Sequence, residues 1–245
     1  MDKTIHYNRK VEKYVNTHNF DSIDFQPFQT FKWFQLLLAP ILAWLIYQGL
    51  LFGLHYFLGK NQNLFNYLAG LTNLIVFGGF FWIFGLRSRK LDLLITGIKP
   101  IEFGSKKWIL LAILSATALL IVRIVLMVIL IDLFPGISPP SGTSPDPSPF
   151  LLDFTVTALM VPIGEELFFR AFLFKGLCQK THVWIAIIVS SIFFGVAHFS
   201  ILQGISAFIF GIVVAYFYHR SESIYIPILM HMINNGLLTI LLHFF

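Results

Sequence analysis

Seven long apolar stretches constrain this 245-residue chain more than any other feature. An α-helix rises 1.5 Å per residue, so about 20 apolar residues cross the hydrocarbon core of a bilayer. Because lipid offers no hydrogen bonds to the backbone, apolar stretches of this length cross it as helices. The sequence therefore predicts an all-α, polytopic membrane helix bundle with about seven transmembrane helices (six to eight), over residues 34–58, 64–86, 108–134, 150–177, 183–199, 201–218 and 224–245.

The range of six to eight crossings comes from the fifth and sixth stretches. Residues 183–199 and 201–218 are near the lower length limit for a crossing and are joined only around Ser200. We expect them to form either a tight helical hairpin or one bent, partly re-entrant pair. In the sixth stretch, small residues recur at four-residue spacing, which predicts close helix packing and a scaffold role for Ala207, Gly211 and Ala215.

The distribution of basic residues predicts the orientation. The net charge is +5, yet only 12% of the residues are charged and 57% are hydrophobic. Fourteen of the 17 Lys and Arg residues fall in segments that would share one side of the membrane. The positive-inside rule makes that side cytoplasmic and places the N-terminus there. We predict a multi-pass protein of the cell membrane whose partners are lipids and not nucleic acid; the sequence leaves its oligomeric state open.

The composition also divides the chain into blocks. Residues 135–149 are rich in Pro and Ser and hold no basic residue, so they are predicted to be an external linker. Before this linker lie a cytoplasmic N-terminal tail (1–33) and a three-span block (34–134). After it lies a four-span block (150–245), which carries all of the candidate site residues.

Polar side chains interrupt three apolar stretches of the four-span block. The candidates are Glu165, Glu166, Arg170, His198, His231 and Asn235. Ionisable groups at membrane depth cost a few kcal/mol each, so they are usually paired or functional. Glu166 and Arg170 are four residues apart and can form an ion pair on one helix face, while Glu165 is rotated by about 100° and is free to face a cavity. Their depths, counted from the cytoplasmic ends, predict one buried polar site near mid-membrane.

The order EELFFR, FGVAH and HMINN resembles the three motifs of the CPBP family of intramembrane proteases (CAAX proteases and bacteriocin-processing enzymes, also called the Abi family). The first motif is matched by Glu165, Glu166 and Arg170, the second by Phe194 and His198, and the third by His231 and Asn235. The resemblance covers about residues 150–245. It implies a CAAX-protease-like endopeptidase that hydrolyses a peptide bond of a membrane-associated peptide or lipidated protein, at a site reached from the cytoplasmic side.

The resemblance also implies roles for these residues. Glu165 and His198 would hold and activate the attacking water, and His231 with Asn235 would stabilise the oxyanion. Glu166 and Arg170 would hold their helix in place, although the second Glu can also be essential in this family. No cofactor is predicted. Zinc is the alternative, because one Glu and two His form a common hydrolytic ligand set.

Two further alternatives stay open at this stage. Family members are also linked to bacteriocin self-immunity, which could act by binding without turnover. Arg123 stands alone in the third stretch, and its candidate partners are Asp132, Asp153 or a lipid phosphate. No function follows for it from the sequence.

Overall fold

The computed structural model describes residues 31–58, 61–88, 96–98, 106–134, 148–198 and 200–245. Most of the predicted tail and linker lie outside these described residues, so their predicted character remains a prediction. At the edges of the two predicted segments, two residues pack against the bundle. Phe31 is buried against Phe172, and Ser148 is buried and accepts a hydrogen bond from Asn66.

The described residues are helical and confirm the predicted all-α bundle. The helices are α2 (Trp33–Leu58), α3 (Gln62–Phe80) continued by the π-helix η1 (Phe81–Arg87), α4 (Lys106–Leu133), α8 (Val183–Val196), α9 (Ile201–Ser221) and α10 (Tyr225–Phe244). Between α4 and α8 runs one helical stretch made of α5 (Phe150–Phe154), η3 (Thr155–Met160), α6 (Val161–Glu166), η4 (Leu167–Phe174) and α7 (Lys175–Cys178).

Five helices are long and apolar enough to cross a membrane by length and composition: α2, α3 with η1, α4, α9 and α10. The stretch 150–178 is helical throughout but carries Glu165, Glu166 and Arg170, and it is not among these five. Helix α8 has 14 residues, which corresponds to about 21 Å. It is therefore shorter than the hydrocarbon core of a typical bilayer.

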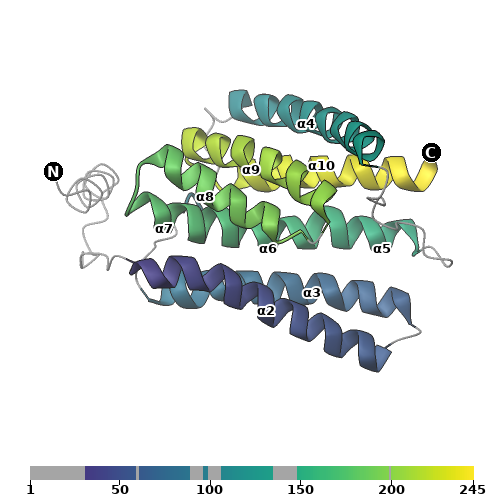
Figure 1. Cartoon of the computed structure of the whole chain (residues 1–245), viewed down its shortest axis with the longest axis horizontal. Helices are drawn as coiled ribbons and strands as arrows, with labels where there is room; N and C mark the ends of the chain where they lie inside the picture. Colours follow the sequence, from purple (N-terminus) through teal and green to yellow (C-terminus); the bar gives the residue numbers. More distant parts are fainter. Residues whose placement is uncertain (1–30, 59–60, 89–95, 99–105, 135–147, 199) are drawn as a thin grey trace.

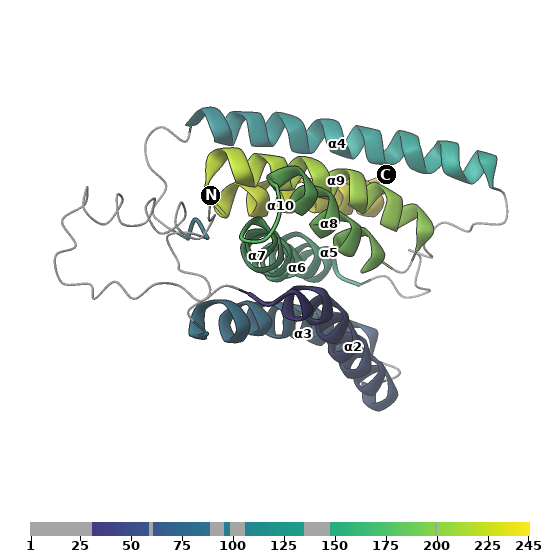
Figure 2. The same ribbon diagram turned by 60° about the vertical axis from the view of Figure 1, so that its left-hand side comes forward.

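The helices are arranged in layers around the stretch 150–178. Figure 1 and Figure 2 show α2 and α3 on one side of it, α9 and α10 on the other, and α4 outermost beyond α9 and α10. Helix α6 packs against α3, whereas α4 packs against α10 and α9. The helix that carries the acidic pair thus lies inside the bundle, with neighbours on both sides.

Helices α8 and α9 form the tight hairpin that was one of the two expectations. A side chain at Gly195 would place its Cβ 2.8 Å from the carbonyl oxygen of Gly204, so the two backbones touch there. Gly211 packs in the same way on Ser191, and Ala207 and Ala215 are buried. The stripe of small residues therefore does serve helix packing, as predicted.

Candidate active site

Glu166 and Arg170 form the predicted ion pair in the centre of the bundle. The Arg170 Nε atom lies 3.1 Å from Glu166 Oε2, and neither side chain has exposed surface. The guanidinium also lies over the ring of Phe194, 4.6 Å from its centroid. The charge of Arg170 is thus balanced by one carboxylate and one aromatic face.

His231 connects α10 to both acids of the pair. Its Nδ1 atom is 2.9 Å from Glu166 Oε1, and its Nε2 atom is 3.9 Å from Glu165 Oε2. A carboxylate can only accept hydrogen bonds, so the Nδ1–H of His231 donates to Glu166. This bond fixes the ring so that Nε2 faces Glu165. The structure therefore brings Glu165, Glu166, Arg170 and His231 together, as the predicted depths required.

Glu165 faces away from Arg170 and towards α3. Asn73 Nδ2 donates to Glu165 Oε1 over 3.4 Å, and Tyr47 of α2 interacts with both Asn73 and Glu165. Gly164 allows this approach, because a Cβ there would lie 2.7 Å from Asn73 Oδ1 and 3.0 Å from a backbone atom of α3. The other carboxylate oxygen, Oε2, is buried and has no hydrogen-bond partner among the described residues.

His198 lies at the end of α8, on the other side of Phe194. Its Nδ1 atom is 2.8 Å from the carbonyl oxygen of Phe194, which can only accept, so Nδ1–H donates and Nε2 of the neutral ring keeps a lone pair. The ring of Phe194 contacts both imidazoles, at centroid distances of 5.1 Å to His198 and 5.7 Å to His231. Within the described chain, no hydrogen bond or ion pair joins His198 to Glu165.

Asn235 ties α10 to the helix of the acidic pair. Its Nδ2 atom donates to the carbonyl oxygen of Thr157 in η3, and Thr157 Oγ1 shares a hydrogen bond with Thr239. Pro162, one turn further along the chain, has no backbone N–H, so the ordinary helical bonding of this region is interrupted. The Asn235 amide thus donates one N–H to the Thr157 carbonyl oxygen in the π-helix η3. Its second N–H is not used by this bond.

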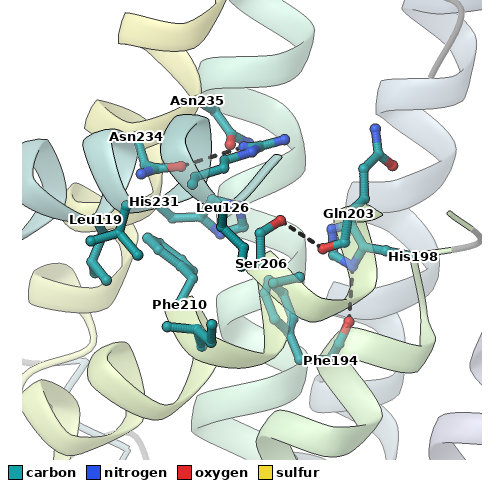
Figure 3. Close-up of a pocket in the computed structure, with 14 residues that line it drawn as sticks. Leu119, Leu126, Phe194, His198, Gln203, Ser206, Phe210, His231, Asn234 and Asn235 are labelled. Carbon is teal, nitrogen blue, oxygen red and sulfur yellow. Dashed lines mark hydrogen bonds between the residues drawn. The ribbon is translucent and has the colours of Figure 1, made fainter. Parts of the chain in front are cut away.

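A cavity of about 40 Å³ lies between α4, α8, α9 and α10. Its polar lining consists of Arg123, His198, Gln203, Ser206, His231, Asn234 and Asn235 (Figure 3). This space is enough for about three water molecules. Three of the six predicted site residues, His198, His231 and Asn235, therefore share one cavity.

Arg123 enters this cavity from α4. Its Nη1 atom is 3.5 Å from Asn234 Oδ1, and Asn234 Nδ2 donates to the carbonyl oxygen of Ala116. Among the described residues, Arg123 forms no ion pair with its candidate partners Asp132 and Asp153, because α4 turns Arg123 towards α10. The third candidate, a lipid phosphate, stays a prediction.

Residues 147–237 match the family model described as Type II CAAX prenyl endopeptidase Rce1-like. All six predicted site residues lie within that match. This match supports the resemblance of that part of the chain to the CPBP family. It is 31% identical over 86 residues to a Bacillus subtilis protein named "Putative membrane peptidase YdiL", and this match spans 35% of each chain. The chain thus matches about a third of the length of this curated relative. No solved structure matches.

The three sequence motifs EELFFR, FGVAH and HMINN meet around one ring, that of Phe194. The first motif supplies the guanidinium above it, the second supplies Phe194 itself and the His198 that binds its carbonyl, and the third supplies His231 at its edge. This packing explains why a phenylalanine stands beside the charged residues of the motifs.

Two residues of the first block that the sequence did not single out as site residues lie next to the candidate site. Asn73 of α3 holds Glu165, and Arg123 of α4 lines the cavity. Two residues of the three-span block therefore lie beside the candidate residues of the four-span block. An amide in the apolar stretch 64–86 was the available signal for Asn73, but spacing along one helix does not tell which neighbour it faces.

Zinc remains an alternative for which the geometry gives limited support. In the part of the chain that the structure describes, no three His, Cys, Asp or Glu side chains form a group that could hold a metal ion. Glu165 and His231 approach each other, whereas His198 binds the backbone of its own helix. We therefore derive no step through a metal, and its role is left to the test described below.

Proposed function

We propose that this chain is an intramembrane endopeptidase that hydrolyses a peptide bond of a membrane-associated peptide or lipidated protein. The observation that carries the proposal is the free Oε2 atom of Glu165, 3.9 Å from His231 Nε2. A water molecule about 2.8 Å from each atom fits this separation, because the two bonds then meet at about 90°. A buried carboxylate oxygen without a partner is suited to accept a proton from such a water.

The two histidines differ in which of their ring nitrogens can donate or accept a hydrogen bond, and this difference supports different roles for them. Both nitrogens of His231 face carboxylates, so its bonds are fully satisfied when both nitrogens carry protons. This arrangement supports His231 as a donor to the substrate oxygen. His198, with Nδ1–H bound to a carbonyl, instead offers a lone pair on Nε2, which suits an acceptor for the attacking water.

In the proposed reaction, the oxygen of the water bonds to the scissile carbonyl carbon while Glu165 takes one of its protons. The electron pair of the C=O bond moves to the oxygen. As the water bonds to carbon, the hydrogen bond from the Nε2–H of His231 passes from the water to this oxygen, and it stabilises the negative charge together with the remaining N–H of Asn235. Collapse of the tetrahedral intermediate breaks the C–N bond, and Glu165 returns the proton to the leaving amine. Glu166 and Arg170 hold His231 in place and do not touch the substrate.

The test compares the peptides in membranes that carry wild-type protein with those in membranes that carry Glu165→Gln. Peptides with new termini in the wild-type sample only are the expected result, and the same cut should be reproduced by purified protein in vesicles. Thermal unfolding of both proteins is the control that the variant is folded. Two results together would contradict turnover: identical peptide sets in the two membranes, and no cleavage of prenylated or unprenylated peptides by purified wild-type protein. They would favour a role in self-immunity that acts by binding alone.

A further inference from the structure

Asn73 is a buried amide in the middle of the apolar helix α3. Only 2% of its surface is exposed. Burying an amide costs free energy unless its polar atoms find partners, so such a side chain in a membrane helix usually joins a neighbouring helix. The partner here is the proposed general base. Asn73 Nδ2 donates to Glu165 Oε1 over 3.4 Å, and within the described part of the chain this is the one hydrogen bond that Glu165 receives.

The two adjacent acids differ in how firmly they are held. Glu166 makes charged contacts at 3.1 Å with Arg170 and at 2.9 Å with His231. The Glu165 side chain is 13% exposed, and its contact with His231 is 3.9 Å long. The last torsion of a glutamate is broad and roughly two-fold, so its own helix does not decide which oxygen faces His231. Because Asn73 holds Oε1, the oxygen that remains to face His231 is Oε2.

The position of the Asn73 amide is itself fixed by close packing. A Cβ at Gly164 would lie 2.7 Å from Asn73 Oδ1 and 3.0 Å from the Cα atom of Leu74, so α6 and α3 touch there. Tyr47 of α2 interacts with the same amide. Asn73 thus lies between the backbone of α6 and a side chain of α2. A donor held in this way on a rigid helix can orient a catalytic group.

We propose that Asn73 is a positioning residue of the peptidase reaction, which holds one oxygen of Glu165 so that the other is directed at the attacking water. This inference rests on the proposed function. Asn73 acts through Glu165 and does not touch the substrate. Since Asn73 lies outside the matched residues 147–237, the inference gives the three-span block a part in the reaction.

The test compares kcat, KM and the pH profile of kcat for wild-type protein and Asn73→Leu in vesicles, with a synthetic prenylated peptide as substrate. Leucine has nearly the shape of asparagine but no hydrogen-bond donor, and Asn73→Ala is the smaller second variant. Asn66→Leu is the matched control, because Asn66 lies two turns earlier on α3 and its Nδ2 donates to Ser148 Oγ over 2.8 Å. The control loses an interhelical hydrogen bond of the same kind, away from Glu165. Thermal unfolding reports the folded state of each protein.

We expect kcat of Asn73→Leu to fall about tenfold, as the loss of one hydrogen bond to a charged group allows, and KM to stay unchanged. The acid limb of the pH profile should move to higher pH, because a hydrogen bond to a carboxylate favours its charged form. This shift does not depend on the fraction of folded protein. The other titratable groups that face Glu165 are the same in both proteins, namely Tyr47 of α2, His231 of α10 and Arg170 of its own helix.

Asn66→Leu should melt earlier than wild-type protein but keep its kcat and pH profile. A wild-type kcat and pH profile in folded Asn73→Leu or Asn73→Ala would overturn the inference. So would a fall in kcat without a shift of the profile, if Asn66→Leu showed the same fall. Loss of folding in both Asn73 variants would also reject it, because Asn73 would then be a residue of the fold alone. Failure of the proposed function would appear separately, as missing cleavage by wild-type protein, and would remove this role of Asn73 as well.

Discussion

Replacing Glu166 by glutamine should destabilise the whole bundle, whereas the same change at Glu165 should remove only the chemistry. Glu166 makes two charged contacts, with Arg170 at 3.1 Å and with His231 at 2.9 Å. Glu166 and Arg170 are fully buried, and His231 is 4% exposed. A glutamine cannot carry the negative charge, so Arg170 would remain in the interior without its counter-ion.

The expected cost follows from these contacts. Removing one partner of a buried ion pair costs about 3–5 kcal/mol. For a protein of this size, that corresponds to a fall in melting temperature of roughly 6–20 °C. Glu165 makes one long hydrogen bond, from Asn73 at 3.4 Å, and its other oxygen has no hydrogen-bond partner among the described residues. Glutamine keeps an oxygen for Asn73 and loses only the long ion pair with His231 at 3.9 Å, so we expect Glu165→Gln to cost about 1 kcal/mol, less than Glu166→Gln.

The assay is thermal unfolding of both purified variants in the same detergent, together with peptide cleavage. Both variants should be inactive, and only Glu166→Gln should melt early. In the double variant Glu166→Gln/Arg170→Gln, the unpaired charge is gone, so part of the lost stability should return. Equal melting temperatures of the two single variants would refute the roles assigned here, with Glu165 as the general base and Glu166 as the residue that holds Arg170 and His231 in place. A double variant less stable than Glu166→Gln would refute the role of the buried charge.

Three further predictions concern packing, orientation and metal. Gly164→Ala should lower the free energy of unfolding by about 1–3 kcal/mol and slow cleavage, because the new Cβ would lie 2.7 Å from Asn73 Oδ1. A variant with the melting temperature and activity of the wild type would contradict the close contact of α6 with α3. In a background without native cysteine, an impermeant maleimide on intact cells should label Ser141→Cys and spare Ser88→Cys, and the reverse pattern would overturn the predicted cytoplasmic N-terminus. The purified protein should hold no stoichiometric zinc and should keep most of its activity after prolonged chelation. The metal alternative would be supported if the protein held about one zinc per chain, lost this zinc and its activity together on chelation, and regained activity when zinc alone was added.

The sequence was sufficient for those features that are set within one helix. The length of each apolar stretch predicts a helix because lipid leaves the backbone no other partners. The pairing of Glu166 with Arg170 follows from four-residue spacing, and the small residues of α9 predict its close contact with α8. Even the separation of the two acids onto different faces follows from about 100° per residue.

Contacts between helices needed the tertiary structure. That His231 binds Glu166, that Asn73 reaches Glu165 and that Arg123 turns to Asn234 depend on the order and rotation of the helices in the bundle. Helices such as α4 are apolar on all sides, so their sequence does not mark the face that meets a neighbour. The outer place of α4, beyond α9 and α10, had no sequence signal for the same reason. Local spacing thus determined which side chains share a face, whereas packing between almost uniformly apolar surfaces decided which faces meet.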